Sequence, residues 1–298
     1  MISVVIPCYN AAAFLERAVK SALKQSVSGM EIILVNNNST DETADVIQDL
    51  VDKYGREANI IHADEPKKGA CAARNKGLSL AGNDFIQFLD ADDEILEGKL
   101  KRQLQLIESA NADIVAGTYE FVAPNAIIKR RLKKPHQDVW KGLISTQLGI
   151  TSANLWRKEA LLKIDGWDES LSSSQEYDLL FRLLKRGNLL VRDYELSCFV
   201  YAEDNSVSRS GNVERTNRIV DNYVNLRLRI REYLMSKGLF KDAVVHCFNI
   251  TLYLFLLSRK RFSPSYVKEK LSILKLNVPL SVKVKVNAKI AIHKILGR

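Results

Sequence analysis

Short apolar runs alternate with helix-like patterns over the first hundred residues. Runs rich in β-branched residues predict buried strands at 2–7, 31–35, 59–63 and 84–90. Apolar side chains recur at helical spacing between them, at 12–25, 39–54 and 69–81. Ser39 opens a Ser-x-x-Glu sequence that predicts a capping box. Because crossover connections are right-handed, this order predicts a doubly wound, mainly parallel α/β sheet with helices on both faces.

The positions that follow the predicted strands are polar. They read Pro-Cys-Tyr-Asn at 7–10, three asparagines at 36–38, His-Ala-Asp at 62–64 and Asp-Ala-Asp-Asp at 90–93. Ligands of doubly wound sheets bind beyond the carboxyl ends of the strands, so these segments predict the functional site. The Gly-x-Gly-x-x-Gly and Walker A sequences are both absent from the chain, which disfavours a dinucleotide or P-loop site.

The pattern loosens beyond residue 94. It predicts a helix over 100–109, a strand over 112–122, an exposed basic loop over 129–135, a helix over 177–186 closed by Gly187, and a strand over 188–201. A polar run at 203–212 predicts a boundary, and helical patterns follow it, including an apolar one at 243–257. We therefore expect one domain over 1–210 and a helical C-terminal region over 211–298.

Composition is typical of a soluble globular protein. The 298 residues are 46% hydrophobic and 27% charged, which suits one large domain with an appendage. Four cysteines lie far apart without a Cys-x-x-Cys pair or a preceding signal-peptide pattern, so we expect a reduced, cytoplasmic protein. The four histidines lack zinc-site spacing, and no apolar run is long enough to span a bilayer.

Positive charge is concentrated towards the C-terminus. The net charge is +9, but residues 211–298 hold 18 Lys and Arg against 5 Asp and Glu, a net charge of +13. The first 210 residues hold 26 and 30, a net charge of −4. A basic helical appendage suits an anionic membrane surface, which would make the protein peripheral on the inner face of the plasma membrane. A solvated tail and a buried helix are the alternatives.

Two aspartates close the fourth predicted strand. Asp90 and Asp92 are two residues apart, so strand alternation puts both carboxylates on one face at the rim of the sheet. Their charges repel each other unless a cation or hydrogen-bond donors compensate them. A divalent ion such as Mn2+ or Mg2+, held also by substrate phosphates, is the expected partner. The alternative is a helix N-cap, since Asp92 and Asp93 precede the next helical pattern.

Three further side chains are candidates for the chemistry. Arg74 follows small residues that let a helix pack closely, and its guanidinium suits phosphate; the alternative is a surface ion pair. Glu176 and Asp178 lie near a predicted helix start, and residues two apart on a helix point to different faces. We therefore expect one of them in the site as a general base, with dipole-stabilising acids as the alternative.

The segments 4–26, 33–43, 73–93 and 164–187 resemble, in order and spacing, the motifs of the family 2 glycosyltransferases. The resemblance extends from residue 2 to about residue 210 and implies the GT-A fold. It implies an inverting, metal-dependent enzyme of the hexosyl- or N-acetylhexosaminyltransferase type that uses a nucleotide-sugar donor. The Gln-x-x-Arg-Trp motif of processive synthases and transmembrane spans are missing from the sequence, which favours transfer of a single sugar.

The resemblance also implies roles for parts of the chain. Residues 1–100 would bind the nucleotide-sugar, and residues 101–210 would bind a saccharide or lipid-linked saccharide acceptor in polysaccharide biosynthesis of the bacterial cell-surface type. The nucleoside pocket would be lined by Pro7, Tyr9, Asn36 and Asn37, with Arg74 nearby. Asp90 and Asp92 would contact the ribose and the metal-bound diphosphate. Nucleic acid is not expected as a partner.

The sequence departs from the family in two places. The usual Glu-Asp acid pair reads Gln175-Glu176 here, so the general-base role passes to Glu176, with Asp178 as second choice. A metal-ligating His often present near residues 201–208 is missing, and Glu203 or Asp204 would have to substitute for it. Trp167 could stack on an acceptor sugar, and a core tryptophan is the alternative.

The three consecutive asparagines divide between two roles. The family usually has an Asp in the 36–37 pair. An amide offers one donor and one acceptor, which matches the N3–H and O4 edge of uracil and thymine. Asn36 and Asn37 therefore favour a UDP- or dTDP-sugar. Asn38 stands where the family often has Gly, so we expect it to take a positive φ in a turn.

Two other functions fit parts of this sequence. A nucleotidyltransferase also uses acids and a metal on a related sheet, but it typically carries a Gly-rich basic loop after the first strand, and residues 6–16 are not of that kind. A degenerate transferase-like module with a nucleic-acid-binding tail is the second alternative. The complete Asp-x-Asp sequence and the acid-bearing helix speak against degeneracy.

Overall fold

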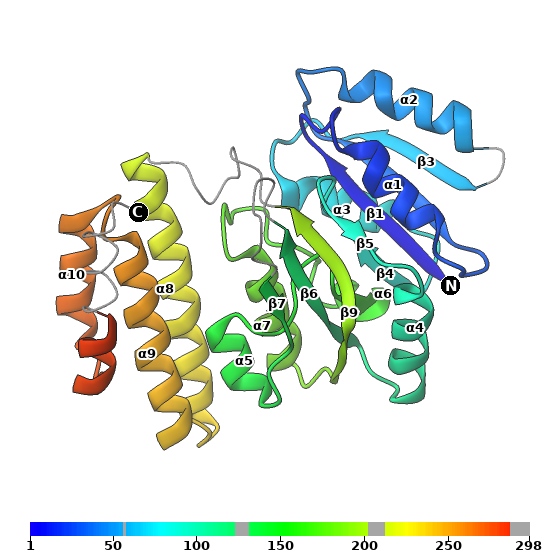
Figure 1. Cartoon of the computed structure of the whole chain (residues 1–298). Helices are drawn as coiled ribbons and strands as arrows, with labels where there is room; N and C mark the ends of the chain where they lie inside the picture. The colour runs from blue at the N-terminus through cyan, green and yellow to red at the C-terminus, as the bar shows by residue number, and fades with distance from the viewer. Residues whose placement is uncertain (56–57, 123–130, 202–211, 287–298) are drawn as a thin grey trace. The chain divides into compact units, whose positions relative to one another are not determined.

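The computed structural model describes residues 1–55, 58–122, 131–201 and 212–286 (Figure 1). The chain divides into two compact units, Met1–Arg209 and Ser210–Arg298. The candidate ligands Glu203 and Asp204, and the boundary predicted at 203–212 except for its last residue, lie outside the described residues.

The first half of unit 1 is the predicted doubly wound sheet. Its parallel strands are β1 (Ile2–Cys8), β2 (Glu31–Asn36), β3 (Asn59–Asp64) and β4 (Phe85–Phe88), in the spatial order β3-β2-β1-β4. The connecting helices are α1 (Leu15–Leu23), α2 (Thr43–Tyr54) and α3 (Ala70–Leu80). The strands and helices predicted for residues 1–90 are thus confirmed, with shifts at their ends.

The second half of unit 1 continues the sheet with mixed strand directions. Beyond β4 the order is β8 (Leu155–Arg157), β6 (Ile114–Val122), β9 (Leu190–Tyr201) and β5 (Glu94–Ile95). β8 is antiparallel to both neighbours, whereas β6 and β9 run parallel. The helices of this half are α4 (Lys99–Ser109), α5 (Val139–Ser145), α6 (Lys158–Leu162) and α7 (Gln175–Lys185).

The basic segment predicted as an exposed loop is a strand in part. β7 (Arg131–Lys133) pairs with β6 through Tyr119 to Phe121. The prediction was wrong for these residues because an available sheet edge stabilises an extended backbone that local polarity does not indicate. Residues 129 and 130 lie outside the described residues.

Each face of β1 packs on a different helix layer. Alternate residues from Ile2 to Cys8 belong to one apolar core with α1, and the buried residues Leu15 and Val19 contribute from that helix. The small-residue helix α3 packs on the other face of β1 and β2. Both faces of the sheet are therefore covered by helices, and ligands of such sheets bind at the carboxyl ends of the strands.

The capping box predicted at Ser39 does not form. Helix α2 begins at Thr43, whose N donates a hydrogen bond to Asp41 Oδ1 at 3.1 Å. The Ser39 hydroxyl accepts a hydrogen bond from Asn10 N at 3.2 Å, and the Thr43 hydroxyl accepts one from Ala11 N at 2.7 Å. Asp41 therefore takes the capping role predicted for Ser39, and Ser39 contacts the loop after β1. At the end of α7, Gly187 takes a φ of 89°, as predicted for a helix C-terminus.

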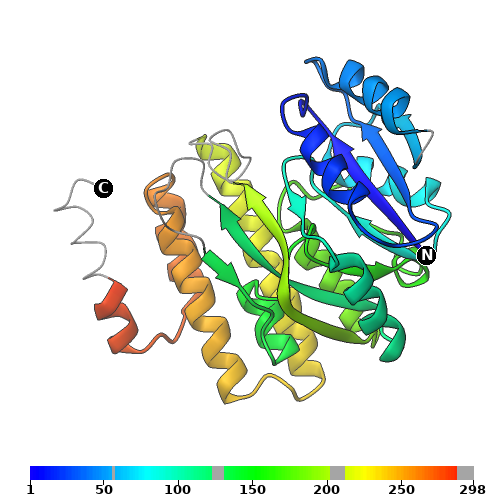
Figure 2. The ribbon, with the colours of Figure 1, turned by 45° about the vertical axis from the view of Figure 1, so that its right-hand side comes forward.

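Unit 2 consists of helices in its described part. They are α8 (Val213–Ser236), α9 (Asp242–Arg259) and α10 (Pro264–Leu274), and Figures 1 and 2 show α8 and α9 side by side. Tyr223 of α8 stacks on Phe255 of α9 with ring centroids 3.6 Å apart. Cζ of Arg227 lies 3.5 Å from the centroid of the Tyr223 ring. None of the described helices combines the length and apolarity that crossing a membrane requires.

A lysine is buried in the core of unit 1 near the ends of β4 and β9. Lys99 is 0% exposed, and its Nζ donates a hydrogen bond to Gln87 Oε1. Burial lowers the pKa of Lys99 to about 7. Since an unfolded lysine titrates near 10.4, folding releases a proton from this side chain above pH 7.

We predict that Lys99 makes the stability of the protein depend on pH. Between pH 7 and 8.5 the unfolded chain keeps the proton that the folded lysine loses, so the free energy of unfolding should rise by about 1.5 kcal/mol relative to that of Lys99→Met. Urea unfolding across this range measures the difference. The exposed Lys101 of the same helix provides the control, since Lys101→Met should keep the wild-type pH dependence. Parallel pH profiles for wild type and Lys99→Met would contradict the prediction.

Candidate functional site

The carboxyl ends of the parallel strands meet at one edge of the sheet. Cys8 of β1 pairs with Asn36 of β2, and Asn36 pairs with Asp64 of β3. On the other side of β1, Leu89 N donates a hydrogen bond to Val5 O at 2.9 Å. This register brings the predicted nucleoside residues after β1 and β2 to the same edge as the acidic residues after β4.

The hydrogen bonds of Asn37 differ from those expected of a residue that reads a base. The residue is buried, and its Nδ2 donates to Glu65 O and Lys67 O, both at 2.8 Å. Its Oδ1 accepts a hydrogen bond from Gly69 N at 2.8 Å. Both N–H groups of the carboxamide and one of the two lone pairs of its oxygen are therefore used on the backbone of the loop after β3. Asn37 thus shapes the edge and has no N–H left to donate to a base.

The other two asparagines lie at the surface of the same edge. Asn36 is half-buried, and its Nδ2 donates to Asp64 Oδ1 at 2.9 Å. Asn38 has a φ of 60°, which confirms the predicted turn. Tyr9 has 62% of its surface exposed, and Pro7 beside it is partly buried. Asn36 and Tyr9 thus have surface available for a nucleoside.

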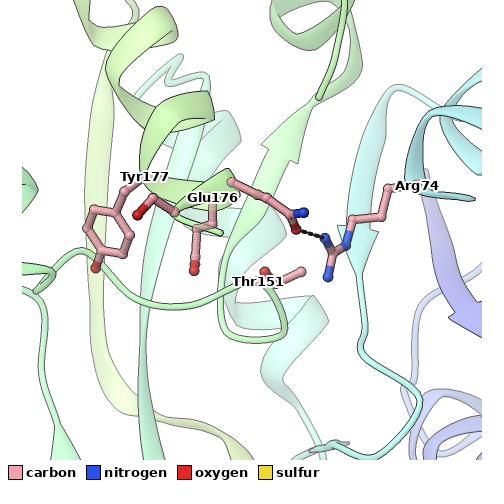
Figure 3. A pocket seen from close by; sticks show the side chains of 6 residues that line it. Arg74, Thr151, Glu176 and Tyr177 are labelled. Atoms are coloured by element: carbon pink, nitrogen blue, oxygen red, sulfur yellow. Dashed lines mark hydrogen bonds between the residues drawn. The ribbon is translucent and has the colours of Figure 1, made fainter. Parts of the chain in front are cut away.

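Arg74 joins the acidic loop to helix α7. Its Nη2 forms an ion pair with Asp90 Oδ1 at 2.7 Å. Its Nη1 donates a hydrogen bond to Gln175 Oε1 at 3.2 Å, drawn as the dashed line in Figure 3. The Arg74 side chain is only 8% exposed. The alternative of a surface ion pair is therefore wrong, because this pair is largely buried.

Trp167 is a core residue. It is 2% exposed, its ring meets Phe88 edge-on with centroids 5.2 Å apart, and the Arg74 guanidinium lies 4.6 Å from its ring. A side chain covered in this way cannot stack on an acceptor sugar. Of the two interpretations of Trp167, the structure supports the core tryptophan.

Glu176 lines a pocket beside this cluster. The pocket is partly open, has a volume of about 190 Å³, and is lined by Arg74, Thr151, Ser174, Gln175, Glu176 and Tyr177. In Figure 3, Arg74 and Glu176 approach it from different helices, with Thr151 between them. Glu176 Oε1 is buried without a hydrogen-bond partner among the described residues. Burial raises the pKa of Glu176 well above its ordinary value, the charge of Asp90 adds to the rise, and Arg74 opposes it.

Asp178, the second-choice base, has a different environment. It is 1% exposed and forms an ion pair with Arg182 Nε at 2.7 Å on the next turn of α7. Arg182 in turn donates to Ile164 O at 2.7 Å. The two acids therefore point to different faces of the helix, and it is Glu176 that lines the pocket.

The acidic loop after β4 carries three carboxylates within four residues. Asp90 and Asp92 are half-buried, whereas Asp93 is buried. Burial, followed by the charges of Asp90 and Asp92, raises the pKa of Asp93 well above its ordinary value. The N-cap alternative for Asp92 and Asp93 is wrong, because α4 begins only after Gly98.

The acidic loop fits a divalent ion that shares its coordination with phosphates. The part of the chain that the structure describes contains no group of three His, Cys, Asp or Glu arranged to hold a metal. Mg2+ and Mn2+ sites on substrate phosphates typically need only one or two carboxylates. Arg74 pairs with Asp90, so one cation stands against the three carboxylates of the loop, and a divalent ion would offset part of the remaining negative charge.

Two pocket residues carry no signal in the sequence pattern. Thr151 lies in a turn before β8 whose sequence has no periodicity or motif. Ser174 takes a φ of 59° directly before α7. A serine in the left-handed region is uncommon, and such strain is often found at functional sites, but it is visible only in the structure.

Known proteins are similar to this chain in sequence and in fold. A family model described as glycosyl transferase family 2 matches residues 3–164, more than half of the chain, and ends before Glu176. The Escherichia coli protein described as UDP-Glc:alpha-D-GlcNAc-diphosphoundecaprenol beta-1,3-glucosyltransferase WfgD is 25% identical over 79% of this chain and 91% of its own length. The chain spans between 39% and 61% of the length of three other curated relatives.

Two solved structures have a similar fold. TarS 1–349 of S. aureus in complex with UDP-GlcNAc has a TM-score of 0.63 and 18% identity, with 95% of this chain and 77% of that chain covered. A mannosyltransferase of Pyrobaculum calidifontis in complex with GDP-Man and Mn2+ has a TM-score of 0.62 and 14% identity, with 98% and 80% covered. Together with the family match, these likenesses show that the chain belongs to glycosyl transferase family 2 and has the GT-A fold.

Proposed function

We propose that the protein is an inverting glycosyltransferase that moves one sugar from a nucleotide-sugar to a saccharide or lipid-linked saccharide acceptor. The observation that carries this proposal is the pocket in which Glu176 lies beside the Arg74–Asp90 ion pair. A buried carboxylate of raised pKa is a good proton acceptor, and it stands next to the side chains that suit a diphosphate. Residues 1–100 would bind the donor and residues 101–210 the acceptor.

The proposed reaction is a direct displacement at the anomeric carbon. An acceptor hydroxyl forms the new C–O bond while the bond to the diphosphate oxygen breaks, and Glu176 takes the hydroxyl proton. Arg74 lies where it can donate to the diphosphate as negative charge builds on it. A divalent ion held by Asp90 and Asp92 would offset part of the same charge.

A UDP- or dTDP-sugar is the favoured donor class. Asn36 donates one N–H to Asp64 and accepts one hydrogen bond from Ser39 N, which leaves one N–H and one lone pair for a uracil or thymine edge. The exposed Tyr9 directly follows Cys8, the strand partner of Asn36, and offers an aromatic ring. The E. coli relative is named for UDP-Glc and for a diphosphoundecaprenol-linked acceptor, and TarS was solved with UDP-GlcNAc. The archaeal neighbour was solved with GDP-Man and Mn2+, so the fold itself accommodates more than one base.

Thermal unfolding with a panel of nucleotide-sugars tests the donor class. A UDP- or dTDP-sugar at about 100 times its Kd should stabilise the protein by about 2.7 kcal/mol and raise the Tm by roughly 5 °C. Mn2+ should increase this shift in the wild type. Asp92→Ala should lose the increase, because it removes one proposed ligand of the ion. A shift produced only by GDP-sugars would overturn the donor assignment, and no shift with any nucleotide-sugar would overturn the function.

Substituting the two acids of α7 one at a time distinguishes the proposed base, Glu176, from Asp178, whose carboxylate has a structural role. Glu176→Gln should lower sugar transfer at least about 10³-fold because the proton acceptor is lost, while donor binding stays within about twofold. Asp178→Asn breaks the pair with Arg182 and should cost stability, with kcat in the folded fraction within about threefold of wild type. Glu176 accepts a proton only when it is deprotonated. Because its pKa is raised, wild-type kcat should fall as the pH is lowered, and the fall should begin at a higher pH than an ordinary glutamate would give. Full activity of Glu176→Gln would remove the base assignment.

The C-terminal region is proposed to hold the enzyme on an anionic membrane, at the inner face of the plasma membrane. Residues 270–298 contain seven Lys and Arg and no Asp or Glu. Within the described part, residues 280–286 are helical, and Leu280 and Val284 are 75% and 58% exposed one turn apart. Apolar side chains facing outward among lysines suit the interface of an anionic bilayer, where a lipid-linked acceptor would lie.

Vesicle sedimentation tests this docking. Binding should require anionic lipid, weaken as salt rises, and fall about 30-fold in Lys283→Gln/Lys285→Gln, since each basic residue near an anionic surface contributes about 1 kcal/mol. Lys24→Gln/Lys101→Gln removes two exposed lysines of unit 1 and should bind as wild type does. Equal binding to neutral and anionic vesicles would contradict the proposal, as would equal losses in both double variants.

A further inference from the structure

One buried hydroxyl holds both ends of the acidic loop. Ser152 is 0% exposed, and its Oγ accepts a hydrogen bond from Asp90 N at 3.1 Å and donates one to Asp93 Oδ2 at 2.5 Å. The Ser152 carbonyl accepts from Gln87 Nε2 at 3.0 Å. Ser152 therefore holds the first and last residues of the loop and the strand before it, although it belongs to neither the loop nor that strand.

The same segment of chain holds the helix that carries Glu176. Tyr177, the next residue of α7, accepts a hydrogen bond from Leu148 N at 2.9 Å through its hydroxyl and donates to Gly149 O at 3.1 Å. Residues 148–154, which we call the bracket segment, thus contact the acidic loop through Ser152 and α7 through Tyr177. Between these contacts, Thr151 lines the pocket.

The bracket segment is closely fitted to its surroundings. Asn154 closes it on itself by donating to Leu148 O at 3.0 Å, and it fixes it to β6 by accepting from Gly117 N at 3.0 Å. A Cβ on Gly149 would run into the Asn154 carboxamide, and a Cβ on Gly117 would run into Ala153 O. A segment packed this tightly cannot shift without breaking several hydrogen bonds, so its shape is well defined.

The acidic loop is also fixed from its other side. Arg17 of α1 donates from Nη2 to Asp92 O at 2.6 Å, and Asp93 N donates to Asp90 O at 3.0 Å within the loop. Backbone groups from Asp90 to Asp93 are therefore held by named partners on two sides. The loop is rigid enough to transmit the position of the bracket segment to the Asp90 and Asp92 side chains.

We propose that the bracket segment is a positioning device that sets the distance between the acidic loop and Glu176, with Ser152 and Tyr177 as its positioning residues. The inference rests on the proposed function, in which the acidic loop holds the departing diphosphate and Glu176 takes the acceptor proton. Neither residue touches the reacting atoms in this scheme. Each acts through the group it holds.

The physical need for such a device follows from the direct displacement. The attacking hydroxyl and the departing diphosphate lie on opposite sides of the anomeric carbon, so the base and the leaving-group site must keep one separation. A misplacement of about 1 Å in such an arrangement can lower the rate about 10²-fold. Glu176 and the acidic loop come from distant parts of the sequence, and the bracket segment contacts the structures on which both are mounted.

Ser152→Ala tests the proposal, and the chain supplies a matched control. Ser3 is also 0% exposed, and its Oγ donates to Glu31 Oε1 at 2.5 Å and accepts from Asn83 N at 3.2 Å. It makes the same two kinds of hydrogen bond at the amino end of β1, away from the pocket. Both variants should lower the urea midpoint to a similar degree, but only Ser152→Ala should lower kcat, by about 10²-fold.

Tyr177→Phe provides a second measurement if Ser152→Ala does not fold. It removes the hydroxyl that holds Leu148 and Gly149, so kcat should fall about tenfold while the donor Kd, measured separately, stays within about twofold. In the double variant the two losses should be less than additive, because both act through one segment.

The outcomes separate the inference from the proposed function. Wild-type protein that transfers no sugar from any nucleotide-sugar would remove the function itself. With an active wild type, three results would overturn the positioning role: wild-type kcat in Ser152→Ala, an equal loss of kcat in Ser3→Ala, or wild-type kcat in Tyr177→Phe. A loss confined to Ser152→Ala and Tyr177→Phe supports it.

Discussion

The ion pair between Arg74 and Asp90 is the interaction on which the site depends. Arg74 comes from α3, Asp90 from the end of β4, and the second arm of the guanidinium reaches Gln175 at the start of α7. One buried cation thereby joins three elements and compensates part of the negative charge of the acidic loop. Because the Arg74 side chain is only 8% exposed, removing Asp90 would leave a buried charge without its partner. Burial and the charge of Asp90 raise the pKa of Glu176, and the charge of Arg74 opposes that rise.

The sequence carries enough information to predict the parallel half of the sheet and the residues at its carboxyl edge. β-branched runs followed by polar residues mark β1, β2 and β4, and the Asp-x-Asp sequence marks the loop after β4. The positive φ of Asn38 follows from the turn in which it lies. These features depend on local pattern and on one topological rule, which is why they can be predicted without coordinates.

What the sequence could not provide are the contacts between distant segments. The carboxamide of Asn37 appeared free to read a base because its partners, the backbone of residues 65–69, are nearly thirty positions away. Trp167 looked equally suited to a sugar and to the core until its neighbours Phe88 and Arg74 were known. Ser152 has no motif at all, and its role is visible only from the hydrogen bonds it makes. Burial and pairing decide each of these cases, and neither is a property of the local sequence.

The position of Asn37 has a consequence for how the donor preference of this enzyme could change over time. The Asn37 amide makes three hydrogen bonds to the backbone of the loop after β3, and the Asn38 amide adds two more, so the shape of that loop does not depend on the side chain at position 9. Tyr9 and Asn36, which are proposed to contact the nucleoside, are exposed and half-buried and contribute little to the core. Substitutions at these two positions should change the free energy of unfolding only slightly. Selection could therefore alter the base preference of the proposed site there while the loop held by Asn37 stays the same.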